Sequence, residues 1–417
     1  MDTMAMDVAA GVRPDATIVI VGAGQAGGWA AQTLRSEGFG GRIVLIGDEA
    51  HMPHERPPLS KAVLAGDAAP ESTWLFKEAA FAALDLDWRP GVRVARIDRA
   101  GKRVELAGGE SIAYDKLILC TGGRARALAL QGAATARVHT LRSVEDALRL
   151  RAALDGARSL VVIGGGWIGL EVAATERKKG LEVVVLEAGG RLCERSVPAE
   201  VSEYMLKLHR AHGTRIVLGA RLEAFGTAED GRSTVVLGNG ETLVADAIFV
   251  GVGLVPNDAL AREAGLACDG GVIVDTRCLS CDPDILAAGD VAVAPNRWAG
   301  RQLRLESWQN AQEQGMAAAR SVLGQAVDHQ PLPWFWSDQY DMNLQIYGMP
   351  APGDRLVVRG EPDAGSFLLF YLDGEVVRAA IGVNAARDLR FARRLIEQRK
   401  PVEAERLADA AVPMAKV

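Results

Sequence analysis

Apolar and polar positions follow a recognisable order near the start of the chain. Residues 17–21 (TIVIV) form a short β-branched run, typical of a buried strand, and a glycine cluster comes directly after it. The pattern then predicts a helix over 28–38, closed by Gly38, and a second strand over 42–47 (RIVLIG). Together these segments predict a complete β-turn-α-β unit.

The same order returns once more along the chain. Residues 159–163 (SLVVI) predict a strand, residues 170–180 a helix and residues 182–186 (EVVVL) a second strand. This pair of units is the only internal repeat in the sequence. The chain therefore contains two similar α/β units.

A glycine motif of the form G-x-G-x-x-G opens each expected helix. Its positions are Gly22, Gly24 and Gly27 in the first unit, and Gly164, Gly166 and Gly169 in the second. The first glycine permits a tight turn, the second lets the backbone approach a pyrophosphate, and the third lets helix and strand pack closely. The helix N-terminus then offers N–H groups to the phosphates. Two complete units predict that the chain binds two dinucleotides.

An acidic residue stands at the end of the second strand of each unit. Asp48 follows the first unit, with Glu49 as a neighbour that could substitute for it, and Glu187 ends the second. A carboxylate here accepts hydrogen bonds from ribose hydroxyls, although a strand-end acid can also simply be solvated. Glu187 suits the 2′-hydroxyl of NADH and repels the 2′-phosphate of NADPH, whereas the nearby Arg191 favours the alternative. One chain with two dinucleotides usually passes electrons between them, which indicates FAD and NADH as cofactors.

The remaining segments predict how the domains are connected. Strands expected within 114–123, 245–257 and 284–291 let the chain leave the first domain, build the second and return. After residue 330, clustered aromatics, antiparallel strands with a hairpin turn at Asp373-Gly374, and a helix over 385–398 indicate a third part. The predicted class is α/β, with two Rossmann-like dinucleotide-binding domains, one inserted in the other, and a C-terminal α+β domain. The predicted boundaries are 14–123 and 257–330 for the FAD-binding domain, 124–256 for the NAD-binding domain and 331–417 for the C-terminal domain.

Composition and charge exclude several classes of protein. The 417 residues are 49% apolar and 24% charged, and the net charge of -6 argues against a nucleic-acid binder. The longest apolar runs are shorter than a membrane span, and the N-terminus has no apolar signal region. The odd count of five cysteines without framework spacing predicts a reducing, cytoplasmic location.

Two small clusters of reactive side chains admit other chemistry. Cys278 and Cys281 form a C-x-x-C pair, which is either a redox dithiol or, as we expect, two loop residues. His209 and His212 lie three residues apart on an expected helix. They are interpreted as a partly exposed helix end. No metal site is predicted, because the sequence offers no third metal ligand beside the two histidines.

Seven motifs in this order resemble a family of flavoproteins. They are ERPPLSK (55–61), CTGGRAR (120–126), TLRSVEDA (140–147), GGGWIGLEVAA (164–174), AAGDV (287–291), ESWQNA (306–311) and PWFWSDQY (333–340). The chain resembles the FAD-dependent ferredoxin reductases that serve Rieske-type ring-hydroxylating oxygenases and bacterial haem-thiolate monooxygenases. Rubredoxin reductases and apoptosis-inducing factor share the architecture. The implied fold is that of glutathione reductase, but neither glycine-rich helix carries the cysteine pair of a disulfide reductase.

The resemblance implies a role for each site residue. Lys61, stiffened by Pro57 and Pro58, is implied to lie beside the isoalloxazine, where a cation stabilises negative charge on the flavin. Glu171 is implied to meet the nicotinamide carboxamide near Lys61, and Trp336 to lie on the nicotinamide side. The residues implied to contact FAD are Gly22, Gly24, Gly27, Asp48, Arg56, Lys61, Val94, Arg142, Asp290 and Trp308. Those implied to contact the nicotinamide dinucleotide are Gly164, Gly166, Gly169, Glu171, Glu187 and Trp336.

The function that the resemblance implies is NADH:ferredoxin reduction. Hydride passes from NADH to FAD, and two single electrons pass to a 2Fe–2S ferredoxin, in an aromatic-hydrocarbon dioxygenase system or a monooxygenase system. The oxygenase is reached only indirectly, and neither nucleic acid nor membrane is an expected partner. The alternatives are a rubredoxin reductase, an NADH oxidase, or a non-catalytic NADH-sensing flavoprotein resembling apoptosis-inducing factor. A basic stretch with Arg387, Arg390 and Arg394 on one helix face is either a solvated surface or a docking patch for the ferredoxin.

Overall fold

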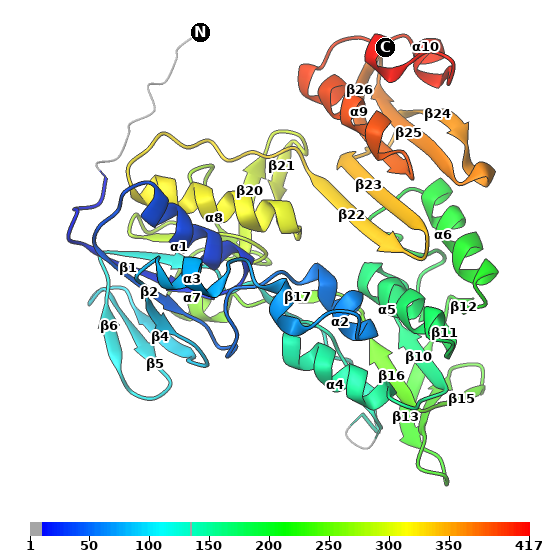
Figure 1. Cartoon of the computed structure of the whole chain (residues 1–417), viewed down its shortest axis with the longest axis horizontal. Helices are drawn as coiled ribbons and strands as arrows, with labels where there is room; N and C mark the ends of the chain where they lie inside the picture. Colours follow the sequence, from blue (N-terminus) through cyan, green and yellow to red (C-terminus); the bar gives the residue numbers. More distant parts are fainter. Residues whose placement is uncertain (1–10, 134–135) are drawn as a thin grey trace. The chain divides into compact units, whose positions relative to one another are not determined.

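A computed structural model describes residues 11–133 and 136–417, which form two compact units (Figure 1). Each unit is built from three separate stretches of the chain. The first unit contains the residues up to 55, 73–124 and 256–335. The second unit contains 56–72, 125–255 and 336–417.

The first unit is built around a parallel five-stranded sheet. Its strand order is β19-β7-β1-β2-β3, and β1 pairs with β2 on one side and with β7 on the other. The strands are β1 (Thr17–Val21), β2 (Arg42–Ile46), β3 (Asp87–Arg89), β7 (Lys116–Leu119) and β19 (Ile285–Ala287). Side chains of β1 alternate between two apolar cores, with Ile18 and Ile20 in one and Val19 and Val21 in the other. The continuous apolar run in the sequence therefore reflects a sheet that is buried on both faces.

Two long helices cover one face of this sheet. They are α1 (Gln25–Ser36) and α8 (Trp308–Val322), blue and yellow in Figure 1. Their backbones approach closely, since a Cβ atom on Gly315 would lie 2.3 Å from the carbonyl oxygen of Ala26. Two short helices, α3 (Glu78–Ala82) and α7 (Ala259–Glu263), belong to the same unit.

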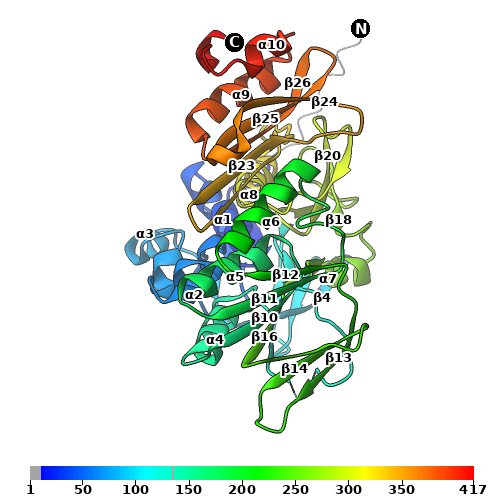
Figure 2. The ribbon, with the colours of Figure 1, turned by 90° about the vertical axis from the view of Figure 1, so that its right-hand side faces the viewer.

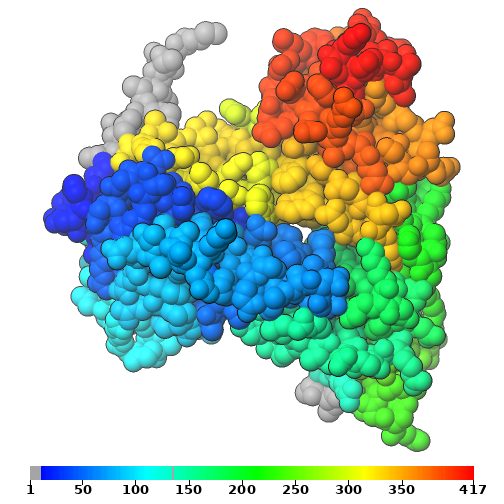
Figure 3. Space-filling view, viewed as in Figure 1, coloured from blue at the N-terminus to red at the C-terminus, as the bar shows by residue number. Residues whose placement is uncertain are grey.

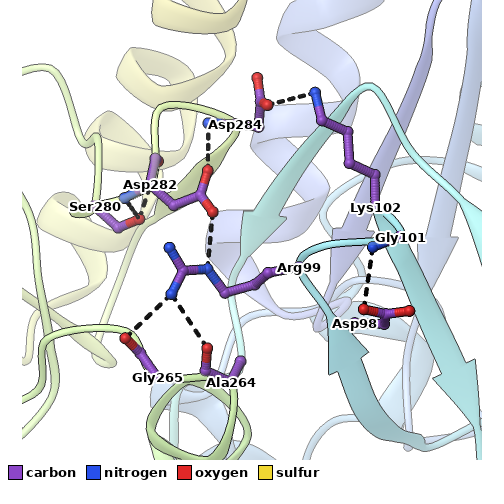
Figure 4. Close-up of polar contacts among 9 residues, drawn as sticks. All are labelled: Asp98, Arg99, Gly101, Lys102, Ala264, Gly265, Ser280, Asp282 and Asp284. Atoms are coloured by element: carbon purple, nitrogen blue, oxygen red, sulfur yellow. Dashed lines mark hydrogen bonds and ion pairs between the residues drawn. The ribbon is translucent and has the colours of Figure 1, made fainter.

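Two small sheets complete the first unit. They are β4 (Val94–Asp98), β5 (Arg103–Leu106) and β6 (Ser111–Ala113), and β18 (Val272–Ile273), β20 (Ala292–Asn296) and β21 (Arg301–Leu303). Charged side chains attach the first of these sheets to neighbouring loops (Figure 4). Arg99 Nε lies 2.8 Å from Asp282 Oδ2, and Lys102 Nζ lies 2.5 Å from Asp284 Oδ2. Arg99 also donates to the carbonyl oxygens of Ala264 and Gly265, so one guanidinium joins three segments.

The second unit repeats the parallel architecture. Its sheet has the order β12-β11-β10-β16-β9, and β10 pairs with β11 and β16. The strands are β9 (Val138–His139), β10 (Ser159–Ile163), β11 (Glu182–Glu187), β12 (Arg215–Leu218) and β16 (Ala247–Val250). The associated helices are α4 (Val144–Leu154), α5 (Trp167–Lys178) and α6 (Ala199–Ala211), labelled in Figure 2 together with β10, β11, β12 and β16. An antiparallel sheet of β13 (Leu222–Thr227), β14 (Ser233–Leu237) and β15 (Thr242–Ala245) supplies Phe225, Val235 and Leu237 to one core face.

A short early segment of the chain also belongs to the second unit. It contains the 3₁₀ helix η1 (Pro57–Ser60) and helix α2 (Ala62–Ala65). Leu59 and Val63 pack in an apolar cluster with Val144 and Ala147 of α4. Lys61, which lies between the two short helices, is therefore held by buried neighbours on both sides. The next 3₁₀ helix, η2, covers Pro70–Thr73.

The C-terminal part forms an antiparallel sheet with helices. Its strand order is β22-β23-β26-β25-β24. The strands are β22 (Trp334–Gln339), β23 (Met342–Gly348), β24 (Arg355–Glu361), β25 (Ser366–Asp373) and β26 (Val376–Val383). The helical segments are η3 (Pro362–Ala364), α9 (Ala386–Gln398), α10 (Ala404–Ala408) and η4 (Met414–Lys416). The predicted hairpin is present, but Asp373 pairs with Val376, so the connecting residues are 374 and 375.

The predicted fold class is confirmed, and one detail of it needs correction. Helices α1 and α5 begin at Gln25 and Trp167, three residues before the starts expected at 28 and 170. The reason is that Gly24 and Gly166, each with extended backbone, are the residues before the first turn. The third glycine of each motif thus lies inside the helix. The paired strands β8 (Gly123–Ala125) and β17 (Leu254–Pro256) lie where the chain passes from one unit to the other.

Within the described ranges, none of the helices combines the length and hydrophobicity that a membrane span requires.

Candidate functional site

The N-terminus of α1 is built to accept an anion. Gly24 precedes the helix, and among the described residues no side chain caps it and no acid lies in its first turn. By contrast, Ser307 caps α8 by accepting from the backbone N–H of Asn310 at 3.2 Å. The N–H groups of α1 therefore remain available to a phosphate, at the positive end of a 12-residue helix.

The turn before α1 leaves no room for a side chain at Gly22. Its φ is +104°, and a Cβ atom would lie 2.1 Å from the carbonyl oxygen of Cys120. The side-chain amide of Gln25, the first residue of α1, has two buried polar atoms without a hydrogen-bond partner among the described residues. A bound pyrophosphate would accept from the amide N–H₂ of Gln25, so this donor fits the phosphates of FAD.

The acids after β2 differ in their surroundings. Asp48, the predicted ribose contact, is exposed, whereas its neighbour Glu49 is half-buried and lies 3.6 Å from Nε2 of the buried His54. Both carboxylates stay candidates for the ribose. Further along, burial raises the pKa of Glu55 above its ordinary value, and a hydrogen bond from Trp308 opposes that shift.

The start of α8 lies beside the strand-end residue Asp290. Gln314 of α8 accepts from the backbone N–H of Gly289 at 2.9 Å and from the side chain of Asn310 at 3.3 Å. The first bond holds the turn that carries Asp290 against α8, and the second, within α8, fixes the Gln314 side chain that accepts it. Val94, the remaining residue predicted to contact FAD in this unit, is buried at the start of β4.

The second glycine motif has the same geometry at α5. Gly164 has φ +105°, and a Cβ atom on it would lie 2.4 Å from the carbonyl oxygen of Gly251. In front of Gly166 the space is open, since a Cβ atom there would meet no described atom within 4 Å. Helix α5 also lacks a capping side chain and a first-turn acid in the part of the chain that the structure describes. The phosphates of a second dinucleotide can therefore come close to the backbone at the start of α5.

The carboxylate of Glu187 is held at the end of β11 by two backbone donors. The N–H of Gly165 donates to Oε2 and the N–H of Gly189 donates to Oε1, each at 2.6 Å. The neighbouring Arg191 turns away from this carboxylate. Its guanidinium donates to the carbonyl oxygens of Val197 and Glu194 and to the hydroxyl of Ser202. The cation that could have favoured a 2′-phosphate is thus engaged elsewhere.

Lys61 and Glu171 meet in a buried ion pair. Lys61 Nζ lies 2.7 Å from Glu171 Oε2, and the Glu171 side chain is 4% exposed. Two hydroxyls donate to the same carboxylate, Ser60 to Oε2 at 2.5 Å and Ser337 to Oε1 at 2.7 Å. These donors satisfy a charge that would otherwise be costly to bury. Glu171 is the fifth residue of α5, one turn further along the helix than expected.

Arg56 and Arg142 lie close together in the second unit. Arg56 donates to the backbone carbonyl of Arg142, and Ser143, the next residue, caps α4 in a capping box with Asp146. Trp336 is half-buried on β22, directly before Ser337. The structure thus gathers Lys61, Glu171 and Trp336 with their neighbours in one unit, and Gly22, Asp290 and Trp308 in the other.

The sequence analysis missed several polar residues of these sites. Ser60 and Ser337 were inside the quoted motifs ERPPLSK and PWFWSDQY, but only a three-dimensional structure shows their contacts with Glu171. The interpretation of His209 as partly exposed is wrong: its side chain is fully buried and bonds to Gln339, while His212 is exposed.

No disulfide joins the two cysteines of the C-x-x-C pair in this structure. Cys278 is buried and Cys281 is exposed, and both are free thiols. Burial raises the pKa of the Cys278 thiol, which makes it a poor nucleophile. The described residues also contain no group of three or more His, Cys, Asp or Glu side chains placed to hold a metal ion.

Two uncapped glycine-rich helices, each on its own parallel sheet, define a dinucleotide-dependent oxidoreductase that binds a flavin and a nicotinamide. The chain belongs to the pyridine nucleotide-disulphide oxidoreductase family, whose model matches residues 16–315. A second model, for the C-terminal domain of reductases, matches residues 334–417. The sequence-based identification of the family and of the enzyme class is confirmed.

Relatives extend the similarity over nearly the whole chain. Rhodocoxin reductase of Rhodococcus erythropolis is 42% identical over 393 residues, 94% of this chain and 92% of that protein. The ferredoxin–NAD(+) reductase component of the anthranilate 1,2-dioxygenase system of Burkholderia cepacia is 41% identical over 396 residues, with 94% and 97% covered. A solved structure, the covalent complex of putidaredoxin reductase with putidaredoxin, matches with a TM-score of 0.92 at 39% identity, with 96% and 97% covered.

Replacing Glu187 by alanine should raise KM for NADH about tenfold with little change in kcat, because a ribose contact binds ground state and transition state alike. Steady-state kinetics with NADH and NADPH measure the effect. Asp230→Ala, which removes an exposed acid of the same unit, is the control. A wild-type preference for NADPH would contradict the role of Glu187.

Proposed function

We propose that this chain is an NADH-dependent ferredoxin reductase that holds FAD and passes electrons to a 2Fe–2S ferredoxin. The observation that carries the proposal is the presence of two complete dinucleotide-binding units in a chain that matches ferredoxin reductases over nearly all of its length. FAD, when bound, accepts a hydride and releases electrons one at a time. Everything the chain itself does is binding, orientation and electrostatics.

The residue roles follow from the contacts of each site. Gly22, Gly24 and Gly27 shape the turn before α1 so that the FAD phosphates approach the free N–H groups of that helix, and Gly164, Gly166 and Gly169 do the same for NADH at α5. Lys61 holds a positive charge that stabilises the negative charge arising on the flavin during hydride transfer. Glu171 orients Lys61 and accepts from the nicotinamide carboxamide. Beyond these, we propose FAD contacts for Asp48, Arg56, Val94, Arg142, Asp290 and Trp308, and nicotinamide contacts for Glu187 and Trp336.

The proposed domain division keeps the boundaries expected from sequence, with the FAD-binding domain over 14–123 and 257–330. The NAD-binding domain then covers 124–256 and the C-terminal domain 331–417. A cytoplasmic location is also proposed, and it is supported by the five cysteines, all of which are free thiols. The oxygenase that receives the electrons is reached through the ferredoxin alone.

A direct experiment separates this function from its alternatives. The purified protein is expected to contain one FAD per chain, to bleach with NADH under anaerobic conditions, and to reoxidise rapidly with a 2Fe–2S ferredoxin. Rapid reoxidation by oxygen alone would favour an NADH oxidase, and by rubredoxin a rubredoxin reductase. A long-lived reduced complex that turns over slowly would favour an NADH sensor. A protein that neither binds FAD nor responds to NADH would refute all of these.

A basic surface on α9 is a proposed docking site for the ferredoxin. Arg387, Arg390 and Arg394 are exposed, whereas Leu389 and Ile396 are buried, so the arginines share the outward face of the helix. The segment that contains α9, orange-red in Figure 3, lies on the face shown there. Such a patch attracts an acidic partner although the whole chain is net negative.

Reversing two of these charges, Arg390→Glu with Arg394→Glu, should lower the rate of ferredoxin reduction about tenfold, most at low ionic strength. NADH-to-ferricyanide turnover should stay normal, because a small acceptor needs no docking surface. Arg210→Glu with Arg221→Glu, two other exposed arginines, makes the same change in charge and serves as the control. Equal losses with both acceptors, or with both variants, would rule the patch out.

A further inference from the structure

A chain of buried hydrogen bonds leads away from Glu171 into the C-terminal strand β22. Ser337 Oγ lies 2.7 Å from Glu171 Oε1, and Gln339 Nε2 lies 3.0 Å from Ser337 Oγ. Gln339 Oε1 lies 2.7 Å from Nε2 of His209 on α6. Three polar side chains from two elements are thus linked in series to the carboxylate, and all of them belong to the second unit.

Each link of this chain has a defined direction. The carboxylate of Glu171 can only accept, so Ser337 donates its hydroxyl proton to it. Ser337 then accepts from the amide N–H of Gln339, which places the Gln339 carbonyl oxygen toward His209. His209 must therefore donate from Nε2, as the neutral tautomer with its proton on that nitrogen. Burial lowers the pKa of His209 to about 4, which keeps the ring neutral at ordinary pH.

This chain of hydrogen bonds is expensive to bury. Ser337 and His209 have no exposed surface and Gln339 is 2% exposed. His209 Nδ1 has no hydrogen-bond partner among the described residues, which adds a desolvation cost. Apolar side chains of similar size would fill the same space at less cost. The hydrogen bonds between these polar groups fix the orientation of the Ser337 hydroxyl, and this hydroxyl in turn fixes the orientation of the Glu171 carboxylate.

The turn after β22 is clamped so that the chain of hydrogen bonds keeps its geometry. The Tyr340 ring stacks on His212 at 3.7 Å between ring centres and meets the ring of His209 edge-on at 5.2 Å. Its hydroxyl lies 3.1 Å from Thr214 Oγ1, and Lys178 of α5 donates to its backbone carbonyl at 3.0 Å. The strand that carries Ser337 and Gln339 is therefore fastened to both α5 and α6.

We propose that Ser337, Gln339 and His209 form a positioning relay that sets the orientation of the Glu171 carboxylate. The inference rests on the proposed role of Glu171 at the nicotinamide. Three donors, Ser60, Lys61 and Ser337, occupy three of the roughly four lone-pair sites of the carboxylate. The relay keeps the remaining site aimed at the carboxamide of NADH. The C-terminal part of the chain thus contributes to hydride transfer through α5.

The relay predicts a loss in rate that a hydroxyl alone restores. In Ser337→Ala the limiting rate constant of flavin reduction at saturating NADH, measured by anaerobic rapid mixing, is expected to fall about tenfold, and in Ser337→Thr to stay within about twofold of wild type. Gln339→Met should show a smaller fall in the same rate constant.

Two measurements that require no turnover test the relay as well. Titration calorimetry should show the affinity for NAD⁺ weakened about threefold in Ser337→Ala. Nitrogen-15 NMR of labelled histidine should show the Nε2–H tautomer for His209.

The matched control is Ser233→Ala, which removes another buried serine hydroxyl of the second unit, one that accepts from the backbone N–H of Arg137 and lies outside the relay. An unchanged limiting rate in Ser337→Ala, or an equal fall in Ser233→Ala, would overturn the proposal. Glu171→Gln separates the two levels of inference. If it slows flavin reduction while Ser337→Ala does not, the relay is wrong and the role of Glu171 stands; if neither variant has an effect, both are wrong.

Discussion

Lys61→Met is expected to slow the reduction of bound flavin by NADH about 10²–10³-fold, while FAD remains bound. Lys61 supplies a single positive charge in a confined site, and methionine keeps its length and apolar stem without the charge. The Lys61 side chain is 23% exposed and its partner Glu171 only 4%, so solvent replaces little of the lost interaction. Anaerobic rapid mixing with NADH measures the limiting rate constant directly.

The control for this variant is Lys207→Met, which removes an exposed lysine that pairs with Glu203 and Asp363 in the same unit. It should leave the rate constant unchanged. FAD content and melting temperature of the Lys61 variant should be measured too, because the substitution leaves the buried Glu171 without its cation. A limiting rate constant equal to that of the wild type would exclude Lys61 from the reaction.

Gly22→Ala is expected to abolish stoichiometric FAD binding and to lower the free energy of unfolding by about 2–4 kcal/mol. Two effects add at this position. The positive φ of +104° is unfavourable for alanine, and the new Cβ atom would lie 2.1 Å from a backbone oxygen, which cannot rotate away. The turn must therefore open, and the phosphate-binding N–H groups of α1 lose their alignment. Flavin absorbance per chain and denaturant unfolding measure the two losses.

Two other glycines separate the causes. Gly38 has φ +88° with open space around it. Gly38→Ala should therefore lower the free energy of unfolding only through its unfavourable backbone conformation, by about 1 kcal/mol, and the variant should retain FAD. Gly40 has neither a positive φ nor a neighbour within 4 Å, so Gly40→Ala should change neither the free energy of unfolding nor FAD binding. If Gly22→Ala bound FAD normally, the assignment of this turn to the phosphates would be wrong.

The amino-acid sequence by itself determined the local units and their chemistry. The β-branched run of residues 17–21 predicts a strand because the four side chains after Thr17 are buried on one face of the sheet or the other. The glycine motif predicts the turn because Gly22 and Gly164 require a positive φ and have carbonyl oxygens in close contact. Such signals are local, since turn, helix start and strand lie within one stretch of about 30 residues. The motifs then sufficed to identify the family.

Only the tertiary structure decided which distant side chains act together. Lys61, Glu171 and Ser337 come from three stretches of the chain, and their periodicity within each stretch says nothing of the 2.7 Å contacts between them. His209 illustrates the same limit, because a histidine near a helix end suggests exposure, yet β22 covers it and supplies Gln339 as its partner. Arg191 follows Glu187 by four residues in the sequence, but its bonds to Val197 and Ser202 direct its charge elsewhere. Local propensity determines an element, whereas burial and hydrogen bonding depend on which other elements pack against it.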